Sequence, residues 1–98
     1  MLDFKELYVK FLVRFPQFKD IVSRIGFYID DTAQTAYTDG IDCYFSSQFM
    51  SSLSEEEQLF TFSHEVLHIV FDHIMRAEGK DPYYWNIATD SVINAYLS

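Results

Sequence analysis

The stretch TFSHEVLHIV, residues 61–70, determines the fold that we expect for the whole chain. Uncharged or apolar residues flank its three ionisable groups on both sides, which is typical of a helix in the core of a domain. On a helix of about 3.6 residues per turn, His64 and His68 lie one turn apart on the same face. Buried polar groups are costly without partners, so His64, Glu65 and His68 need a physical reason to be there.

Metal binding is one such reason. Two imidazoles one turn apart can bind the same tetrahedral cation, and zinc is the cation that this spacing favours. Glu65 then lies beside the metal, where its carboxylate can accept a proton from a water molecule. The sequence therefore predicts that His64 and His68 are zinc ligands and that Glu65 is a catalytic general base. The alternative is a core helix whose histidines are hydrogen-bonded to ordinary protein groups.

Composition predicts one small domain, residues 1–98, with enough apolar material for one core, since 49% of the residues are hydrophobic. Fifteen acidic residues against seven basic ones give a net charge of −8, which disfavours nucleic acid and anionic membrane surfaces as partners. No apolar run approaches the length of a membrane-spanning helix. A single cysteine, Cys43, forms no internal disulfide, so we expect a cytoplasmic location. We interpret Cys43 as a packing residue rather than a nucleophile.

The N-terminal part predicts helices that cover the core. Asp3 and Glu6 match a capping box, and apolar residues then follow at helical spacing until Pro16 ends or bends the helix. Residues 18–25 predict one or two further helical turns.

Three short strands are predicted before the motif helix, at residues 25–29, 35–38 and 41–45. Asp39-Gly40 is typical of a two-residue hairpin, so we expect the sheet to be antiparallel. Residues 46–53 are expected to be a polar connection. The fold class predicted is thus α+β.

The motif helix is expected to span residues 55–77. Ser54 and Glu57 match a second capping box at its beginning, and Gly79 is a candidate cap at its end. Residues 81–82, Asp-Pro, are typical of the start of a last helix, which folds back beside the motif helix.

The third metal ligand has two main candidates, because a catalytic zinc site usually has three protein ligands. His73 lies nine residues past His64, about half a turn out of phase on an unbroken helix. Asp90 is the better candidate, since Asn86, Asp90 and Asn94 form one polar stripe on an otherwise apolar helix. In that interpretation the two asparagines hydrogen-bond the ligands. The alternative is a stripe that faces solvent.

Two further polar residues follow the motif. Asp72 lies one turn beyond His68 and is expected to support the ligands or to be a third possible ligand. Arg76 and His73 are candidate substrate contacts, although pairing with nearby carboxylates such as Asp72 or Asp90 is the simpler interpretation.

With these residues identified, the chain resembles the metallopeptidase-like domain that precedes a von Willebrand factor A-like domain in bacterial proteins. The residues that carry the resemblance are Thr38-Asp39-Gly40, His64-Glu65-Val66-Leu67-His68 with His73 and Arg76, and Trp85-Asn86-Ile87-Ala88 with Asp90, Ile93 and Asn94. More distantly, it is similar to the zincin metallopeptidases. The resemblance implies a small zincin-like fold with a short sheet, an active-site helix and a backing C-terminal helix. It also implies zinc on His64 and His68, with Asp90 carried over as the third ligand.

The function expected from this resemblance is zinc-dependent hydrolysis of peptide bonds. The partners expected are a peptide or protein substrate and a covalently linked von Willebrand factor A-like domain, with residues 1–98 being the N-terminal part of a longer protein. An extended substrate is expected to pair with an exposed sheet edge at residues 41–45. The alternatives are a metal-binding but inactive interaction or regulatory module, and a metal-free structural domain.

Overall fold

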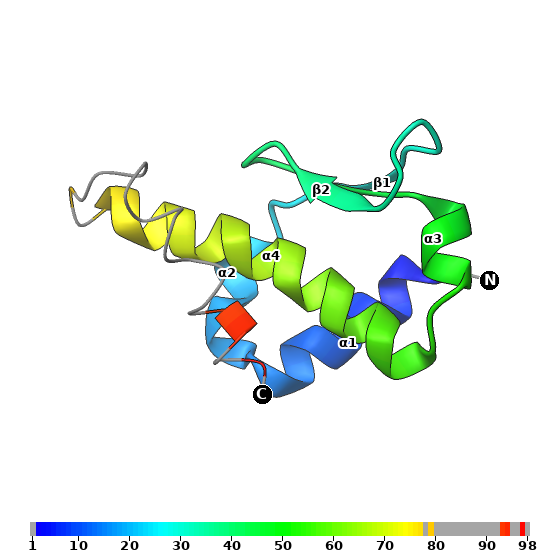
Figure 1. Ribbon diagram of the computed structural model, residues 1–98. Coiled ribbons are helices and arrows are strands. Elements are labelled where there is room, and N and C mark those ends of the chain that lie inside the picture. Colours follow the sequence, from blue (N-terminus) through cyan, green and yellow to red (C-terminus); the bar gives the residue numbers. More distant parts are fainter. Residues whose placement is uncertain (1, 78, 80–92, 95–96, 98) are drawn as a thin grey trace.

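The computed structural model describes residues 2–77, 79, 93–94 and 97, and it has the mixed α+β architecture that the sequence predicts (Figure 1). In chain order the elements are α1 (Phe4–Arg14), η1 (Pro16–Phe18), α2 (Lys19–Val22), β1 (Phe27–Ile29), β2 (Ala36–Thr38), β3 (Cys43–Phe45), α3 (Ser47–Ser51) and α4 (Glu55–Ala77).

Capping contacts set both ends of α4. The backbone N–H of Ser54 donates to Glu57 Oε1 at 2.9 Å, and the backbone N–H of Glu57 donates to Ser54 Oγ at 3.2 Å. These two bonds satisfy donors that the first turn of a helix leaves without intrahelical partners. At the other end, Gly79 adopts a φ of +73° and its N–H donates to the Arg76 carbonyl at 3.1 Å. The predicted beginning and end of the motif helix are both confirmed.

The first helix is also where the sequence places it. The Asp3 carboxylate accepts a hydrogen bond from the Glu6 N–H at 3.2 Å, which caps α1. The helix ends before Pro16, whose ring cannot continue the hydrogen-bonding pattern and which begins the 3-10 turn η1 instead.

The sheet is mixed, which corrects the predicted antiparallel arrangement. The strand order is β1-β3-β2, with β2 antiparallel and β1 parallel to β3. The beginning of β1 is held beside β3 by Gly26, whose N–H donates to Asp42 Oδ1 at 2.8 Å and whose carbonyl accepts from the Cys43 N–H at 2.9 Å. The hairpin pattern concerns only the two strands that the turn joins, β2 and β3. It therefore carried no information about the strand with which β1 would pair.

The connection between β2 and β3 is longer than the predicted two-residue turn. Thr38 and Cys43 are the last paired residues, so the loop comprises residues 39–42. The Asp39 carboxylate accepts the N–H groups of Ile41 at 2.9 Å and Asp42 at 2.8 Å, which closes a wider turn than Asp-Gly alone. The connection predicted at residues 46–53 also contains a helix, α3, whose first turn is capped by Ser46 Oγ.

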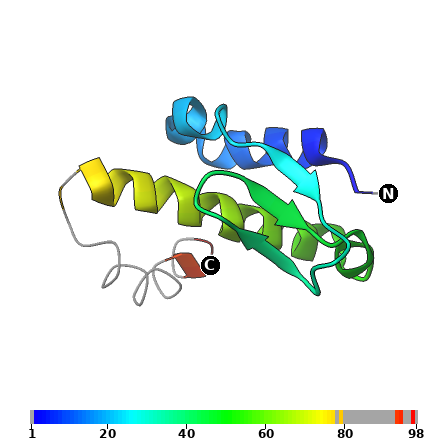
Figure 2. The ribbon, with the colours of Figure 1, turned by 90° about the horizontal axis from the view of Figure 1, so that it is seen from above.

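The helices α1, α2 and α4 lie on the same side of the sheet, and the view from above shows α4 running beneath the strands (Figures 1 and 2). Phe62 is fully buried where these layers meet. Its ring stacks on Phe27 at 4.8 Å and on Phe45 at 6.0 Å, and it meets Phe11 of α1 edge-on at 6.4 Å. This aromatic cluster fixes the rotation of α4 about its own axis. His64, two residues after Phe62, therefore has a defined direction relative to the sheet.

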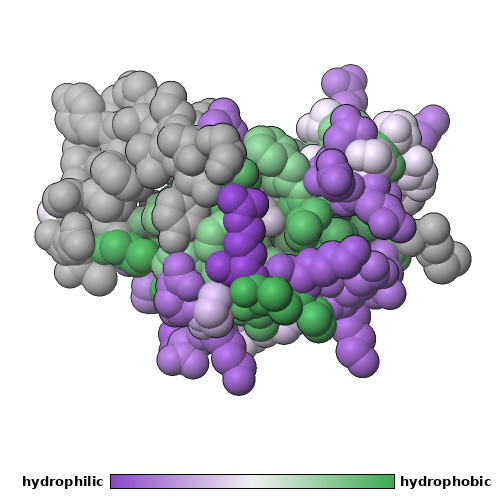
Figure 3. All heavy atoms as spheres, turned by 90° about the horizontal axis from the view of Figure 1, so that it is seen from below, coloured by the Kyte–Doolittle hydropathy of each residue, from purple (hydrophilic) through white to green (hydrophobic). Residues whose placement is uncertain are grey.

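The end of the chain contributes to the same core. Ile93 and Leu97 are buried, and Arg14 of α1 donates to the Leu97 carbonyl at 3.1 Å. From below, the helical side shows hydrophilic residues around a smaller hydrophobic area (Figure 3). Within the described part of the chain, none of the helices has the length and apolar character needed to cross a membrane.

Candidate metal centre

One polar stripe of α4 lines a cavity under the sheet. Each residue turns the helix by about 100°, so residues 64, 65, 68, 72 and 76 fall within an arc of about 120°. These residues are His64, Glu65, His68, Asp72 and Arg76, and all five line the cavity. His73 lies about 180° from His64 on the same helix, is exposed, and is not among the residues lining this cavity.

The cavity has a volume of about 580 Å³ and lies between α4 and the edge strand β2. Its second wall is formed by Ala36, Tyr37, Thr38, Asp39 and Gly40. This wall was not anticipated as part of the site, although its sequence gave the hairpin pattern. Nothing in the local pattern of the two segments indicates that residues 36–40 and 64–76 face one another.

The two motif histidines approach each other at the centre of this stripe. Their Nε2 atoms are 3.2 Å apart, their ring centroids are 4.8 Å apart, and both side chains are half-buried. Two nitrogens bound to one zinc ion at about 2.0–2.1 Å with tetrahedral angles lie roughly 3.3–3.4 Å apart. The observed separation fits a hydrogen bond between the rings, and as a distance it also fits two ligands of one cation once the rings turn their nitrogens toward it. The residues present therefore fit a zinc ion.

A third ligand is not found among the residues that the structure describes: no His, Cys, Asp or Glu of residues 2–77, 79, 93–94 and 97 completes a group of three with the histidine pair. Asp90 and Asn86, the predicted ligand and one of its supporting amides, lie outside the described residues. Asn94 is described and is exposed.

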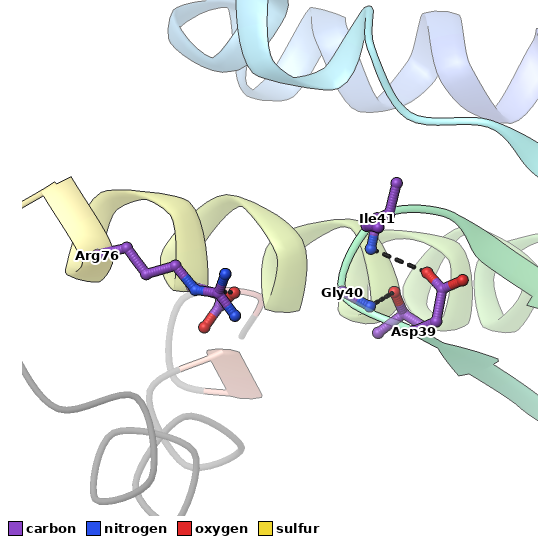
Figure 4. Close-up of polar contacts among 6 residues, drawn as sticks. Asp39, Gly40, Ile41 and Arg76 are labelled. Carbon is purple, nitrogen blue, oxygen red and sulfur yellow. Dashed lines mark hydrogen bonds and ion pairs between the residues drawn. The ribbon is translucent and has the colours of Figure 1, made fainter.

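Asp72 and Arg76 form an ion pair at the far end of the stripe. Arg76 Nε lies 3.1 Å from Asp72 Oδ2, and Asp72 is only 18% exposed whereas Arg76 is 68% exposed. In Figure 4, Arg76 extends back along α4 in the direction of the loop that carries Asp39, Gly40 and Ile41. The simpler interpretation of Arg76 from the sequence was an ion pair with a nearby carboxylate, and the structure contains this pair.

The charged groups in the opposite wall are held firmly. Hydrogen bonds from the backbone N–H groups of Asp42 and Ile41 hold the pKa of the Asp39 carboxyl below its usual value. The Tyr44 hydroxyl donates to Asp39 Oδ2 at 3.0 Å, and this bond raises the pKa of Tyr44 to about 12. The loop that forms this wall is thus held together by its own hydrogen bonds to Asp39.

Cys43 belongs to the core under this wall. Its side chain is buried, and burial followed by the negative charge of nearby Glu65 raises the pKa of the thiol above its ordinary value. A thiol with a raised pKa is a poor nucleophile, which agrees with our interpretation of Cys43 as a packing residue.

The prediction that an extended substrate pairs with an exposed sheet edge at residues 41–45 is wrong. The strand in that segment, β3, is the central strand and pairs on both sides. The edge strand that lines the cavity is β2, which leaves one row of backbone groups unpaired within the described sheet.

One protein family, described as "Putative metallopeptidase domain", has a model that matches residues 10–98. The chain belongs to this family. The matched segment contains His64, Glu65 and His68, and membership confirms the resemblance drawn from the sequence. The name of the family indicates a hydrolase of peptide bonds that uses a metal cofactor. No curated protein and no solved structure matches the chain.

Proposed function

We propose that this chain is a zinc-dependent metallopeptidase domain in which His64 and His68 bind the metal and Glu65 is the general base. The observation that carries the proposal is the 3.2 Å separation of the two Nε2 atoms inside a 580 Å³ cavity that Glu65 also lines. A pair of structural histidines has no need of an adjoining cavity or of a carboxylate at its wall.

Each residue of the stripe then has a chemical task. Zinc, when bound, polarises the substrate carbonyl and lowers the pKa of a water molecule to about 7. The Glu65 carboxylate accepts a proton from that water and passes it to the departing amine. Glu65 is half-buried and lines the cavity, so its carboxylate can serve in this role.

A peptide substrate is positioned by β2 in this proposal. Backbone groups at the free edge of β2 can pair with an extended peptide, which adds one strand to the sheet directly above the histidines. Antiparallel pairing is the more stable arrangement.

We keep Asp90 as the proposed third ligand. His73 lies on the opposite side of an unbroken helix and does not line the cavity, which supports Asp90 over His73 as the proposed ligand. Asp90→Asn is therefore expected to lower zinc affinity by at least tenfold, whereas His73→Gln leaves it within about twofold. Competition with a chelating dye measures both, and the reverse ranking would exclude Asp90.

The remaining proposals concern partners and location. A von Willebrand factor A-like domain in the same protein remains a proposal based on the resemblance. A reducing, cytoplasmic location is supported by Cys43, which is a free and buried thiol.

Glu65→Gln tests the proposed function most directly. The amide keeps the size of the side chain but cannot accept the proton, so hydrolysis of a mixed peptide library should fall about 10²–10⁴-fold. Zinc content, measured by elemental analysis, should stay the same as in wild type. Glu56→Gln is the matched control, because Glu56 is exposed on the same helix and does not line the cavity.

The same experiment separates the alternatives. Undiminished hydrolysis by Glu65→Gln would exclude the general-base role. Zinc bound without hydrolysis by the wild type would favour an inactive metal-binding module, and the absence of zinc from metal-replete protein would favour a metal-free structural domain.

A further inference from the structure

Arg76 is the only lysine or arginine among the described residues that line the cavity. Its ion pair with Asp72 uses Nε, and a guanidinium carries two terminal amino groups beyond that atom. The Asp72 contact therefore anchors the guanidinium through Nε, and Arg76 is one of the residues that line the cavity. The planar edge of a guanidinium is well suited to bidentate binding of a carboxylate.

Two of the acidic residues that line the described cavity, Asp39 and Asp72, already hold protein groups. Asp39 is occupied by the N–H groups of Ile41 and Asp42 and by the Tyr44 hydroxyl. Asp72 holds Nε itself. Both carboxylates thus act as supports for protein groups, and an incoming carboxylate meets a cation that is already anchored at Nε.

The distance from the histidines defines which part of a substrate reaches Arg76. The guanidinium lies at the level of Asp72, one helical turn or about 6 Å beyond His68. An extended peptide advances about 3.3 Å per residue, so this distance corresponds to about two residues.

The direction of the strands defines the side of the scissile bond. In Figure 2, β2 and α4 run in the same direction, so a peptide antiparallel to β2 runs opposite to α4. The N-terminal part of such a peptide lies toward the C-terminal end of α4, which carries Arg76.

We propose that Arg76 binds an acidic side chain of the substrate, two or three residues before the scissile bond, and so makes the site selective for acidic peptide segments. This inference rests on the proposed function for the orientation of the peptide. Its test is a binding measurement, which separates it from the question of turnover.

The probes are fluorescein-labelled octapeptides of mixed sequence in which one position is fixed as Glu, Gln or Lys. They are titrated by fluorescence anisotropy against the zinc-loaded Glu65→Gln chain, which cannot consume them. Glu peptides should bind about tenfold more tightly than Gln peptides, and high salt should reduce the difference. Adding Arg76→Gln should abolish the preference, and adding Arg76→Glu should transfer it to Lys peptides.

Lys10→Gln is the matched control. Lys10 also forms an ion pair with a residue one turn away, with Nζ 2.9 Å from Glu6 Oε1, but it does not line this cavity. The preference for Glu should persist in this variant. Circular dichroism of Arg76→Gln checks the fold, which the exposure of Arg76 should preserve.

Equal binding of Glu and Gln peptides, no binding of any set, or a preference that survives Arg76→Gln would overturn the inference. Mapping the bonds that the wild type cleaves shows where the preferred acidic residue lies relative to the scissile bond. A preference for an acidic residue after that bond would also overturn the inference. If the wild type hydrolyses none of the peptides while the Arg76-dependent preference remains, the proposed function fails and the acidic-peptide site stands.

Discussion

At the scale of single residues, Cys43 shows how the Glu65 carboxylate and the core influence one another. Its thiol is buried in β3, and the charge of Glu65 adds to burial in raising its pKa. In the unfolded chain the same thiol has an ordinary pKa of about 8.5. As the pH rises, the unfolded chain therefore loses this proton before the folded protein does.

Stability should consequently depend on pH through Cys43. The contribution of the protonated thiol is complete below the unfolded pKa and declines as the pH rises above it. Between pH 8 and 9.5, the free energy of unfolding of wild type should fall by about 1 kcal/mol more than that of Cys43→Ala. Urea denaturation of both proteins at the two pH values measures this difference, and parallel losses would contradict it.

At the scale of elements, the parallel pairing of β1 depends on Gly26. A Cβ atom there would lie 2.6 Å from Tyr28 Oη and 2.9 Å from Asp42 Oδ1, so the ring and the carboxylate that holds the strand would have to move. We expect Gly26→Ala to lower the free energy of unfolding by about 1–3 kcal/mol.

Gly40→Ala is the comparison for this prediction. Gly40 has a φ of +89° and no atom within 4 Å of an added Cβ, so only backbone strain of roughly 1 kcal/mol is expected. Chemical denaturation should therefore rank Gly26→Ala as the more damaging change. An equal or smaller loss at Gly26 would contradict this account of how β1 is held.

The starts of α1 and α4 were predictable from sequence to within a residue, because capping is local, whereas α3 was not predicted. Asp3 and Ser54 each accept from an N–H group three residues away, which a sequence pattern captures directly. Strand pairing is not local. The contact of Gly26 with Asp42 spans 16 residues, and it decides between a parallel and an antiparallel neighbour for β1.

At the scale of the whole molecule, the end of the chain stabilises the core. Ile93 is fully buried in the cluster that also contains Phe11 and Phe62. Ile93→Ala should lower the free energy of unfolding by about 2–5 kcal/mol because it leaves a cavity. Val13→Ala, at a position that is 78% exposed, should change it by no more than about 0.5 kcal/mol. Similar effects of the two changes in thermal or urea unfolding would contradict this placement.

The site was predictable only where it lies on one element. The spacing of His64, Glu65 and His68 is a property of one helix, and it predicted that these side chains would gather on one side. The facing wall of β2 depends on tertiary packing, because Phe62 of α4 packs on Phe27 of β1 and Phe45 of β3 and no local pattern encodes these contacts. Asp90 lies outside the described residues and stays a prediction.

Zinc K-edge X-ray absorption of the full chain, loaded with one equivalent of zinc, tests the central claim most directly. Wild type and Glu65→Gln should both show two imidazole nitrogens at about 2.0–2.1 Å from the metal, and His64→Ala should lose this signature. Zinc bound without imidazole ligands, or a wild-type spectrum retained by His64→Ala, would contradict the assignment of His64 and His68 as the metal-binding pair.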